Sequence, residues 1–242
     1  MNDYIILGIL ILVFIFRRFV FHLPELIYWL AHDIRHHDRN YFKEFGMQMY
    51  CGRQGSGKTV GMVWTLERMR RRYPRVKIYT NFAYQHETAP LTGWQDLLSP
   101  DYRNGTNGVI FAIDEIQNEF SSLAWKDFPE SLLSEITQQR KQRICILASS
   151  QVYTRVVKQL REQCYRVVEC KTILGRYTRL KCYDAEDYNV YVDNPDPAKK
   201  FKMHKLWKRS FVQSNALRGL YDTWAKVARL SRIGFVPKQR AE

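Results

Sequence analysis

Short apolar runs of strand length recur along the middle of the chain, separated by longer amphipathic segments. The runs that read as buried strands are residues 47–51, 76–80, 109–113 and 144–149. Helical patterns occupy 58–72 and 129–142. Strands that alternate with helices of this length form parallel β-α-β units, whose sheet is covered by helices on both faces. The pattern therefore predicts an α/β fold with a mainly parallel central sheet.

Two further runs, 164–173 and 177–183, alternate apolar and polar positions on either side of Gly175. Such runs joined by a glycine-containing turn are typical of a β-hairpin, which we expect at the edge of the sheet. Pro195 and Pro197 then mark a boundary. We accordingly expect an α/β domain over 45–193 and a separate extension over 194–242.

The apolar run at residues 4–16 is longer than the others, and no charged side chain interrupts it. As a helix it would measure about 20 Å, less than the roughly 30 Å hydrocarbon core of a bilayer, but Arg17 and Arg18 can reach back to the interface and lengthen the span. We expect a membrane anchor helix over 1–22 and an amphipathic juxtamembrane segment over 23–44. Cations after the run put the remaining chain on the cytoplasmic side. A buried helix of a soluble domain is the alternative.

The segment GRQGSGKT, between the first strand and its helix, has the spacing of a phosphate-binding P-loop. Glycines let the backbone fold around phosphates, and consecutive N–H groups point at them together with the helix N-terminus. We expect Lys58 to reach the β- and γ-phosphates of ATP and the Thr59 hydroxyl to bind Mg²⁺. The residues expected to bind the nucleotide are Gly52, Gly55, Ser56, Gly57, Lys58 and Thr59.

The strand at 109–113 ends in an acidic pair, Asp114 and Glu115. It would deliver Asp114 to the C-terminal edge of the sheet as a ligand of Mg²⁺, usually through water. Glu115 would then orient or deprotonate the water that attacks the γ-phosphate. A helix-capping pair is the structural alternative.

The strand at 144–149 has a polar tip that ends in Gln151. If this strand lies beside the P-loop strand, Gln151 can sense the γ-phosphate or fix the attacking water. A plain strand-end turn is the alternative. We favour the sensor role because the two other motifs accompany it.

The helix at 129–142 ends in a basic stretch that holds Arg140 and Arg143. An arginine here can act as an arginine finger on a neighbour's nucleotide, where it would stabilise the charge of the transition state. A solvated cationic helix end that complements the helix dipole fits the same residues. Arg155 and Arg161 are further candidates for the finger.

Charge indicates the kind of partner. Lys and Arg outnumber Asp and Glu by 38 to 24, a formal net charge of +14, which favours nucleic acid or anionic lipid. In the 194–242 extension, Trp207, Phe211, Tyr221 and Trp224 are interleaved with Lys and Arg. This pattern fits a surface for single-stranded nucleic acid, or an amphipathic helix packed on the domain or on lipid. Both interpretations stay open.

The five cysteines form no CxxC pair and, with the six histidines, no metal-ligand spacing. Cys51 and Cys145 fall in apolar runs, where a thiol acts as a small buried hydrophobe. We expect reduced thiols, a cytosolic domain, and no metal other than the Mg²⁺ of the nucleotide.

Together these motifs resemble the zonula occludens toxin-like (Zot) family, the membrane-linked assembly ATPases of filamentous phages. The resemblance covers roughly residues 45–190 and rests on GRQGSGKT, IYTNF, AIDEIQNEF, QQRKQ and ILASSQ. It implies a RecA-like P-loop NTPase fold near the FtsK/HerA group, which works as rings, so a homo-oligomer is expected. Family members commonly carry their membrane helix after the ATPase domain, whereas here the apolar run precedes it. This departure argues against an exported C-terminal region.

The resemblance thus implies a membrane-anchored motor that hydrolyses ATP, with Mg²⁺, to drive phage assembly and export of the viral genome. It would be a single-pass protein of the host cell inner (cytoplasmic) membrane, with its ATPase domain on the cytoplasmic side. Its partners would be single-stranded or double-stranded DNA, the host membrane, and phage coat or assembly proteins. The alternatives are a genome-packaging ATPase that fills a preformed capsid and a nucleotide-switched, DNA-binding membrane scaffold.

Overall fold

The chain forms two compact units, Met1–Tyr41 and Phe42–Glu242. The computed structural model describes residues 2–36, 38, 40–120, 129–195 and 203–222. Helix α1 (Asn2–Arg35) makes up the first unit and contains Pro24, so the expected anchor and juxtamembrane segment share one helix. Within the described residues, no helix combines the length and the apolar character needed to cross a membrane. Most side chains of the apolar run 4–16 lie outside the description.

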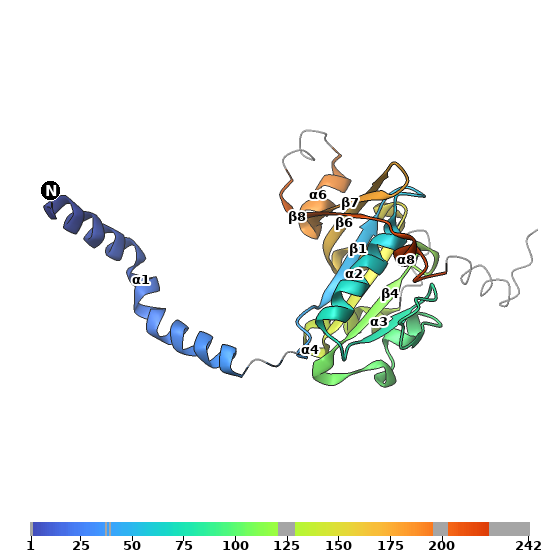
Figure 1. The fold of residues 1–242 in the computed structure, drawn as a ribbon, viewed down its shortest axis with the longest axis horizontal. Helices are drawn as coiled ribbons and strands as arrows, with labels where there is room; N and C mark the ends of the chain where they lie inside the picture. The colour runs from blue at the N-terminus through green and yellow to red at the C-terminus, as the bar shows by residue number, and fades with distance from the viewer. Residues whose placement is uncertain (1, 37, 39, 121–128, 196–202, 223–242) are drawn as a thin grey trace, which may run out of the picture. The chain divides into compact units, whose positions relative to one another are not determined.

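An eight-stranded sheet in the order β3-β2-β4-β5-β1-β6-β7-β8 forms the centre of the second unit (Figure 1). Its strands are β1 (Gly46–Cys51), β2 (Lys77–Thr80), β3 (Ala89–Pro90), β4 (Val109–Ile113), β5 (Ile144–Ser150), β6 (Cys164–Ile173), β7 (Tyr177–Asp184) and β8 (Lys205–Val212). The pairs from β3 through β6 are parallel, while β6-β7 and β7-β8 are antiparallel. The predicted α/β fold with a mainly parallel sheet is confirmed.

Helices cover both faces of this sheet, so its strands are buried on both sides. The helices are α2 (Lys58–Arg72), α3 (Glu130–Thr137), α4 (Gln139–Gln142), α5 (Lys158–Glu162), α6 (Ala185–Asp193) and α8 (Asn215–Arg218), and the 3₁₀ turns are η1 (Trp94–Leu97), η2 (Pro100–Tyr102), η3 (Gly105–Asn107), η4 (Ile116–Asn118) and η6 (Tyr153–Arg155). On β4, Ile110 packs in one core with Leu66 of α2. The next residue, Phe111, packs in the opposite core with Leu132 of α3. Burial of successive residues explains why these strands read as continuous apolar runs.

The expected helix at 129–142 is divided in two. Its first part, α3, ends at Thr137, and Gln138 leaves the helical conformation with φ −94 and ψ 6. The Thr137 hydroxyl donates to the Ser134 carbonyl at 2.7 Å. Such a bond from a side chain back to the preceding turn competes with the helix backbone and bends it.

β5 lies between β1 and β4, an arrangement that decides where the polar segments meet. Cys51 at the end of β1 pairs with Ser150 of β5, and Ile113 at the end of β4 pairs with Ala148. The three strands run in the same direction, so the segments that follow them leave the same carboxyl edge of the sheet. Ligands of open α/β sheets bind at this edge.

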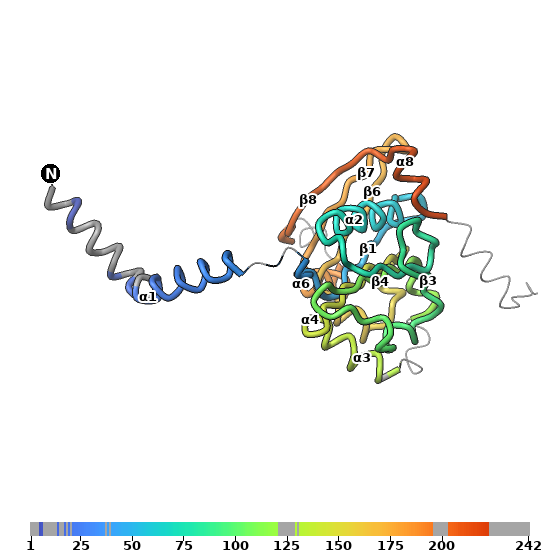
Figure 2. The backbone as a smooth tube through the Cα atoms, turned by 60° about the horizontal axis from the view of Figure 1, so that its bottom comes forward, coloured from blue at the N-terminus to red at the C-terminus, as the bar shows by residue number. Residues whose placement is uncertain are grey.

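The described part of the 194–242 extension belongs to the α/β unit. β8 pairs with β7 and becomes the edge strand, so the β6-β7 hairpin expected at the edge lies one strand inside. The helical interpretation is wrong for Trp207 and Phe211, which lie on β8 and are partly buried on the α2 side. Figure 2 shows β8 next to β7, at the edge of the sheet. The Phe211 ring stacks on Trp64 of α2 with centroids 5.0 Å apart. Trp224 lies outside the described residues.

A buried carboxylate ties α2 to the segment that follows β2. The Glu67 side chain is only 10% exposed and accepts hydrogen bonds from Arg70, at 3.0 Å, and from the Tyr84 hydroxyl. Burial alone would raise the pKa of the Glu67 carboxyl, but these hydrogen bonds outweigh burial and hold the pKa below its usual value. The same segment begins with Asn81, a residue of the site described below.

We expect Glu67→Gln to reduce the free energy of unfolding by about 1–3 kcal/mol near neutral pH, because charge-assisted hydrogen bonds are lost. The folded-state pKa is lower than the unfolded one, so the contribution of the carboxylate is complete above the unfolded-state pKa. It is lost as the pH falls through the folded-state value. Urea unfolding of both proteins at about pH 7 and about pH 3 should therefore show a difference that shrinks in acid. A difference independent of pH would contradict this account.

Candidate nucleotide-binding site

The loop between β1 and α2 is shaped by Gly57, the residue immediately before the helix. Gly57 has φ 85, in the left-handed region. A Cβ atom there would lie 2.5 Å from Thr172 Oγ1 and 3.1 Å from Thr178 Oγ1. Conformation and packing therefore both require glycine at this position. α2 begins at Lys58, and the first N–H groups of a helix have no partner within it. The loop thus has the backbone that an anion site needs.

Two polar groups of this loop, Ser56 Oγ and the Lys58 side chain, are buried. Ser56 Oγ has no hydrogen-bond partner within the described chain, and the Lys58 side chain is only 7% exposed. Lys58 Nζ donates to the Arg53 carbonyl at 3.4 Å. A buried hydroxyl without a partner is costly unless a ligand completes its hydrogen bonds. Together with the buried ammonium group, it fits the phosphates of a nucleotide.

Asp114, directly after β4, touches the first turn of α2. Thr59 Oγ1 donates to the two carboxylate oxygens of Asp114 at 3.2 and 3.3 Å, and the Ser149 hydroxyl donates to the same carboxylate. The backbone of Asp114 is held by Asn81, whose amide accepts from its N–H at 2.8 Å and donates to its carbonyl at 3.1 Å. Asp114 is therefore fixed through both its backbone and its side chain.

Thr59 and Asp114 form a suitable pair for Mg²⁺. Their hydroxyl and carboxylate oxygens are hard donors, and Mg²⁺ usually takes one or two protein ligands beside phosphate oxygens and water. In the described part of the chain, no group of three or more His, Cys, Asp or Glu residues could hold a separate metal ion. The donor set therefore fits a magnesium ion that arrives with a nucleotide.

Glu115 lies where the P-loop, β4 and β5 meet. Its Oε1 is 3.8 Å from Lys58 Nζ, and its Oε2 accepts from Gln151 at 3.2 Å and from the Gln117 amide. Its φ of 55 is unusual for a residue with a side chain, and its N–H donates to Ser149 Oγ at 3.0 Å. The condition stated for Gln151 is met, because β5 pairs with the P-loop strand β1, and Gln151 reaches the site.

Asn81 and Ser149 were missed as candidate site residues by the sequence pattern. Asn81 follows β2 and Ser149 lies near the end of β5, and these two strands flank β4. The sequence signal that could have identified them is a polar residue at the carboxyl end of a strand that neighbours the Asp114 strand. Using this signal requires the order of strands in the sheet, which the sequence pattern leaves open.

Arg140 and Arg143 are not brought to this site. Arg143 precedes β5, whereas Gln151 follows it, and seven strand residues at about 3.3 Å each separate the two edges by roughly 20 Å. Arg143 donates to the Phe42 carbonyl at 3.0 Å, and the Arg140 guanidinium lies 5.6 Å from the centre of the Phe45 ring. A finger role toward a neighbouring subunit stays a prediction. Arg155, in η6 after β5, is exposed at the edge that carries the site.

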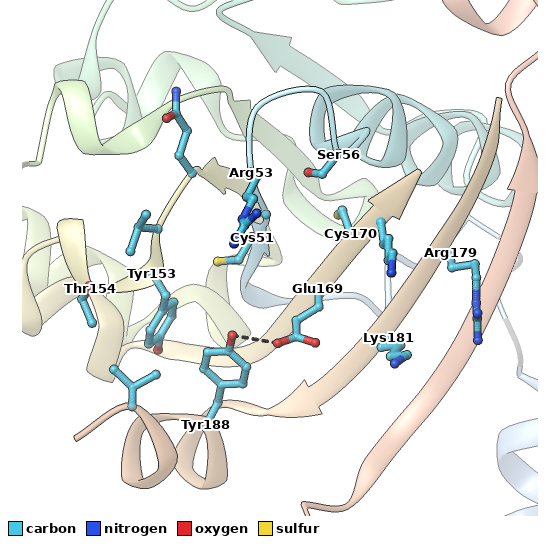
Figure 3. A pocket seen from close by; sticks show the side chains of 15 residues that line it. Cys51, Arg53, Ser56, Tyr153, Thr154, Glu169, Cys170, Arg179, Lys181 and Tyr188 are labelled. Carbon is cyan, nitrogen blue, oxygen red and sulfur yellow. Dashed lines mark hydrogen bonds between the residues drawn. The ribbon is translucent and has the colours of Figure 1, made fainter. Parts of the chain in front are cut away.

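A cavity of about 670 Å³ opens beside the P-loop, toward β6, β7 and α6 (Figure 3). Tyr188 of α6 donates to Glu169 of β6 at 3.1 Å within it. Arg53 and Lys181 add cations to its lining. Burial raises the pKa of the Cys170 thiol, at the cavity wall, to about 12, so this cysteine is protonated near neutral pH. The cavity offers polar, aromatic and charged contacts, and no thiolate.

The segment after β8 reaches the P-loop through a chain of hydrogen bonds. Gln213 is 4% exposed and donates to Thr178 Oγ1 at 2.7 Å. Thr172, which contacts Thr178, donates to the Ser56 carbonyl of the loop at 2.9 Å. Arg218 of α8 donates to Gln213 Oε1 at 2.9 Å. The C-terminal segment therefore supports the outer side of the loop.

Comparison of the sequence finds no matching family model and no similar curated protein. Comparison of the structure finds the N-terminal domain of zonular occludens toxin from Neisseria meningitidis, with 16% identity, 73% of this chain and 98% of that chain covered, and a TM-score of 0.50. It also finds the genome packaging NTPase B204 from Sulfolobus turreted icosahedral virus 2 in complex with AMPPCP, with 11% identity, 58% and 93% covered, and a TM-score of 0.44.

The likeness to the zonular occludens toxin domain concerns the fold, since 16% of residues are identical. The chain shares the fold of that domain, and the Zot-like resemblance drawn from the motifs is confirmed at the level of the fold.

We expect Gly57→Ala to weaken ATP binding at least about tenfold more than Gly55→Ala. The two glycines have φ of 85 and 75, so alanine is strained at both. Only at Gly57 would the new methyl group meet other atoms, since nothing lies within 4 Å of the position at Gly55. An additional clash of about 1.4 kcal/mol corresponds to a tenfold loss. Titration with a fluorescent ATP analogue measures both variants. Equal losses would show that the contact with Thr172 does not constrain the loop.

Proposed function

We propose that this chain is an ATP hydrolase whose turnover drives export of a viral genome during phage assembly. One observation carries the catalytic part of the proposal, namely the contact of the P-loop with the acidic tip of β4. Thr59 lies 3.2 Å from Asp114, and Lys58 lies 3.8 Å from Glu115. A loop shaped for phosphates thus adjoins a carboxylate suited to bind metal and a second one suited to act on water.

The proposed reaction is attack of water on the γ-phosphorus of ATP, with ADP as the leaving group. Lys58 would bind oxygens of the β- and γ-phosphates and stabilise the charge that spreads over them in the transition state. Glu115 would accept a proton from the attacking water. When bound, Mg²⁺ would neutralise phosphate charge and hold the triphosphate against Thr59 and Asp114.

Gln151 would position this water together with Glu115. Its amide already contacts Glu115 Oε2 at 3.2 Å, so one water molecule could be shared by the Gln151 amide oxygen and Glu115 Oε1 once Lys58 has moved away from Oε1. The Lys58–Glu115 ion pair suggests a simple order of events. A bound phosphate would attract the ammonium group of Lys58, and Glu115 would then be free to accept a proton.

The cavity beside the P-loop is a suitable place for the nucleoside. It continues from Arg53 and Ser56 of the loop to Tyr188 of α6, and its volume of about 670 Å³ lies in the range of small-molecule sites. Glu169 would accept a hydrogen bond from a ribose hydroxyl or from an amino group of the base.

The export role follows from the Zot-like motifs and from the net charge of +14, which favours DNA as a partner. A homo-oligomeric ring and contact with coat or assembly proteins belong to the same proposal. Filling of a preformed capsid would use the same chemistry. A neighbouring gene for a small helical coat protein would favour export, and one for a capsid shell would favour packaging.

We further propose attachment of this motor to the inner face of the host cytoplasmic membrane through residues 1–40. Helix α1 exposes large apolar side chains over much of its length, among them Phe14, Phe21, Leu26 and Ile34. Aromatic residues Tyr28 and Trp29 are exposed as well, and such residues favour the lipid–water interface.

Lys58→Ala should abolish ATP binding and turnover, whereas Glu115→Gln should keep ATP binding and lower kcat by about 10²–10⁴-fold, as expected for loss of a catalytic base. Phosphate release and nucleotide titration measure the two steps separately. Glu119→Gln is the matched control, because Glu119 is an exposed carboxylate on the same segment, and it should keep the turnover of the unmodified protein. Normal turnover in Glu115→Gln would refute the assigned role.

Removal of residues 1–41 should release the protein from membranes while basal ATP turnover is retained, since Phe42–Glu242 forms a compact unit of its own. Flotation with vesicles of host-like lipid composition would separate bound from free protein. If the shortened chain floats as completely as the full chain, the attachment lies elsewhere.

A further inference from the structure

A second cavity, of about 270 Å³, lies on the α2 side of the sheet and is lined by arginines from three elements. Arg68 and Arg72 come from α2, Arg166 from β6 and Arg209 from β8. On β6, Val168 and Cys170 belong to the core beneath α2, so Arg166 has the same orientation by the two-residue period of a strand. Trp207 and Phe211 place Arg209 on that side of β8 in the same way.

The positive charge of this cavity is poorly compensated. Throughout the described ranges, no carboxylate forms an ion pair with Arg68, Arg166 or Arg209. The one acidic residue that lines the cavity, Glu44, lies 3.8 Å from Arg72. Partial burial and the neighbouring charges of Arg68 and Arg166 lower the pKa of Arg209. Like charges gathered without a counter-ion are unfavourable, so an anion would stabilise the cluster.

Aromatic rings lie against the same arginines. The guanidinium of Arg209 is 4.5 Å from the centre of the Trp207 ring, and that of Arg68 is 4.7 Å from the centre of the Trp64 ring. Both tryptophans are partly exposed. Guanidinium groups match the geometry of phosphate oxygens, and surfaces that bind single-stranded nucleic acid combine such cations with rings on which bases stack.

We propose that Arg68, Arg166 and Arg209, with Trp207, form a binding site for the phosphodiester backbone of single-stranded nucleic acid. This arginine cluster is separate from the nucleotide site, because Arg68 is ten residues beyond Lys58 along α2, or about 15 Å. The choice of nucleic acid over other polyanions rests on the proposed function and on the adjoining rings. The site gives Arg209 of β8 a role beyond the solubility of an edge strand.

The test is the affinity of the full chain, in neutral detergent and without nucleotide, for a fluorescent single-stranded oligonucleotide across a salt series. Arg166→Gln with Arg209→Gln should weaken binding about tenfold or more. It should also reduce the slope of log K against log salt by about 1.4, since each lost phosphate contact on a single strand contributes about 0.7. The control pair Arg71→Gln with Arg75→Gln removes the same charge from exposed positions outside the cavity. It should change the affinity and the slope much less.

Arg166→Lys with Arg209→Lys keeps the charge and the fold but removes the planar forks, and should give an intermediate loss. Equal losses in the Gln pair and in the control pair would overturn the proposal, because binding would then follow net charge alone. The proposal would also fail if the Gln pair bound the oligonucleotide normally but lost binding to vesicles that contain anionic lipid. It would fail equally if the Gln pair bound the oligonucleotide normally and lost only its binding to inorganic phosphate. Basal ATP turnover of the Gln pair should be unchanged, and Lys58→Ala should still bind the oligonucleotide, so failure of the motor and failure of this site are distinguishable.

Discussion

The contact between the P-loop helix and the tip of β4 joins parts of the chain that are more than 50 residues apart. Thr59 reaches Asp114, and Lys58 reaches Glu115, only because β5 separates β1 from β4 by a single strand. Strand spacing of about 4.8 Å then leaves the two segments about 10 Å apart at one edge, a distance that their side chains can span. Without this strand order, the phosphate-binding loop and its acidic partner would be unrelated groups.

The rest of the fold keeps these groups in place. Asn81 fixes the backbone of Asp114 through two hydrogen bonds. The Ser149 hydroxyl donates to the Asp114 carboxylate and accepts from the N–H of Glu115. The P-loop is supported from its other side by Thr172 and, through Thr178, by Gln213. Such preorganisation matters because groups already in position need little rearrangement when charge develops on a phosphate.

The sequence was sufficient for the parts that depend on local spacing. The P-loop, the acidic tip and the β6-β7 hairpin follow from residue order, and continuous apolar runs predicted the buried parallel strands. The secondary structure of Trp207 and Phe211 could not be decided from the sequence. Two residues four positions apart lie on the same face both of a helix and of a strand. Arg140 and Arg143 belong to the opposite edge of the sheet, which the predicted strand at 144–149 already implied, because both residues precede it and Gln151 follows it. Asn81 and Ser149 acquire their role only from the order of strands, which is a long-range property.

The nucleotide site and the proposed arginine cluster are connected through shared elements rather than through a direct contact. α2 begins at the P-loop and carries Arg68 on its third turn. β8 carries Arg209 and leads directly to Gln213, which supports the loop through Thr172 and Thr178. A polyanion that draws β8 and α2 together would therefore restrict both supports of the loop at once. Any such coupling is reciprocal, so a nucleotide that orders the loop must strengthen binding at the arginine cluster by the same factor. The proposed motor would need this kind of linkage between ATP and nucleic acid, and α2 and β8 are the elements that would provide it.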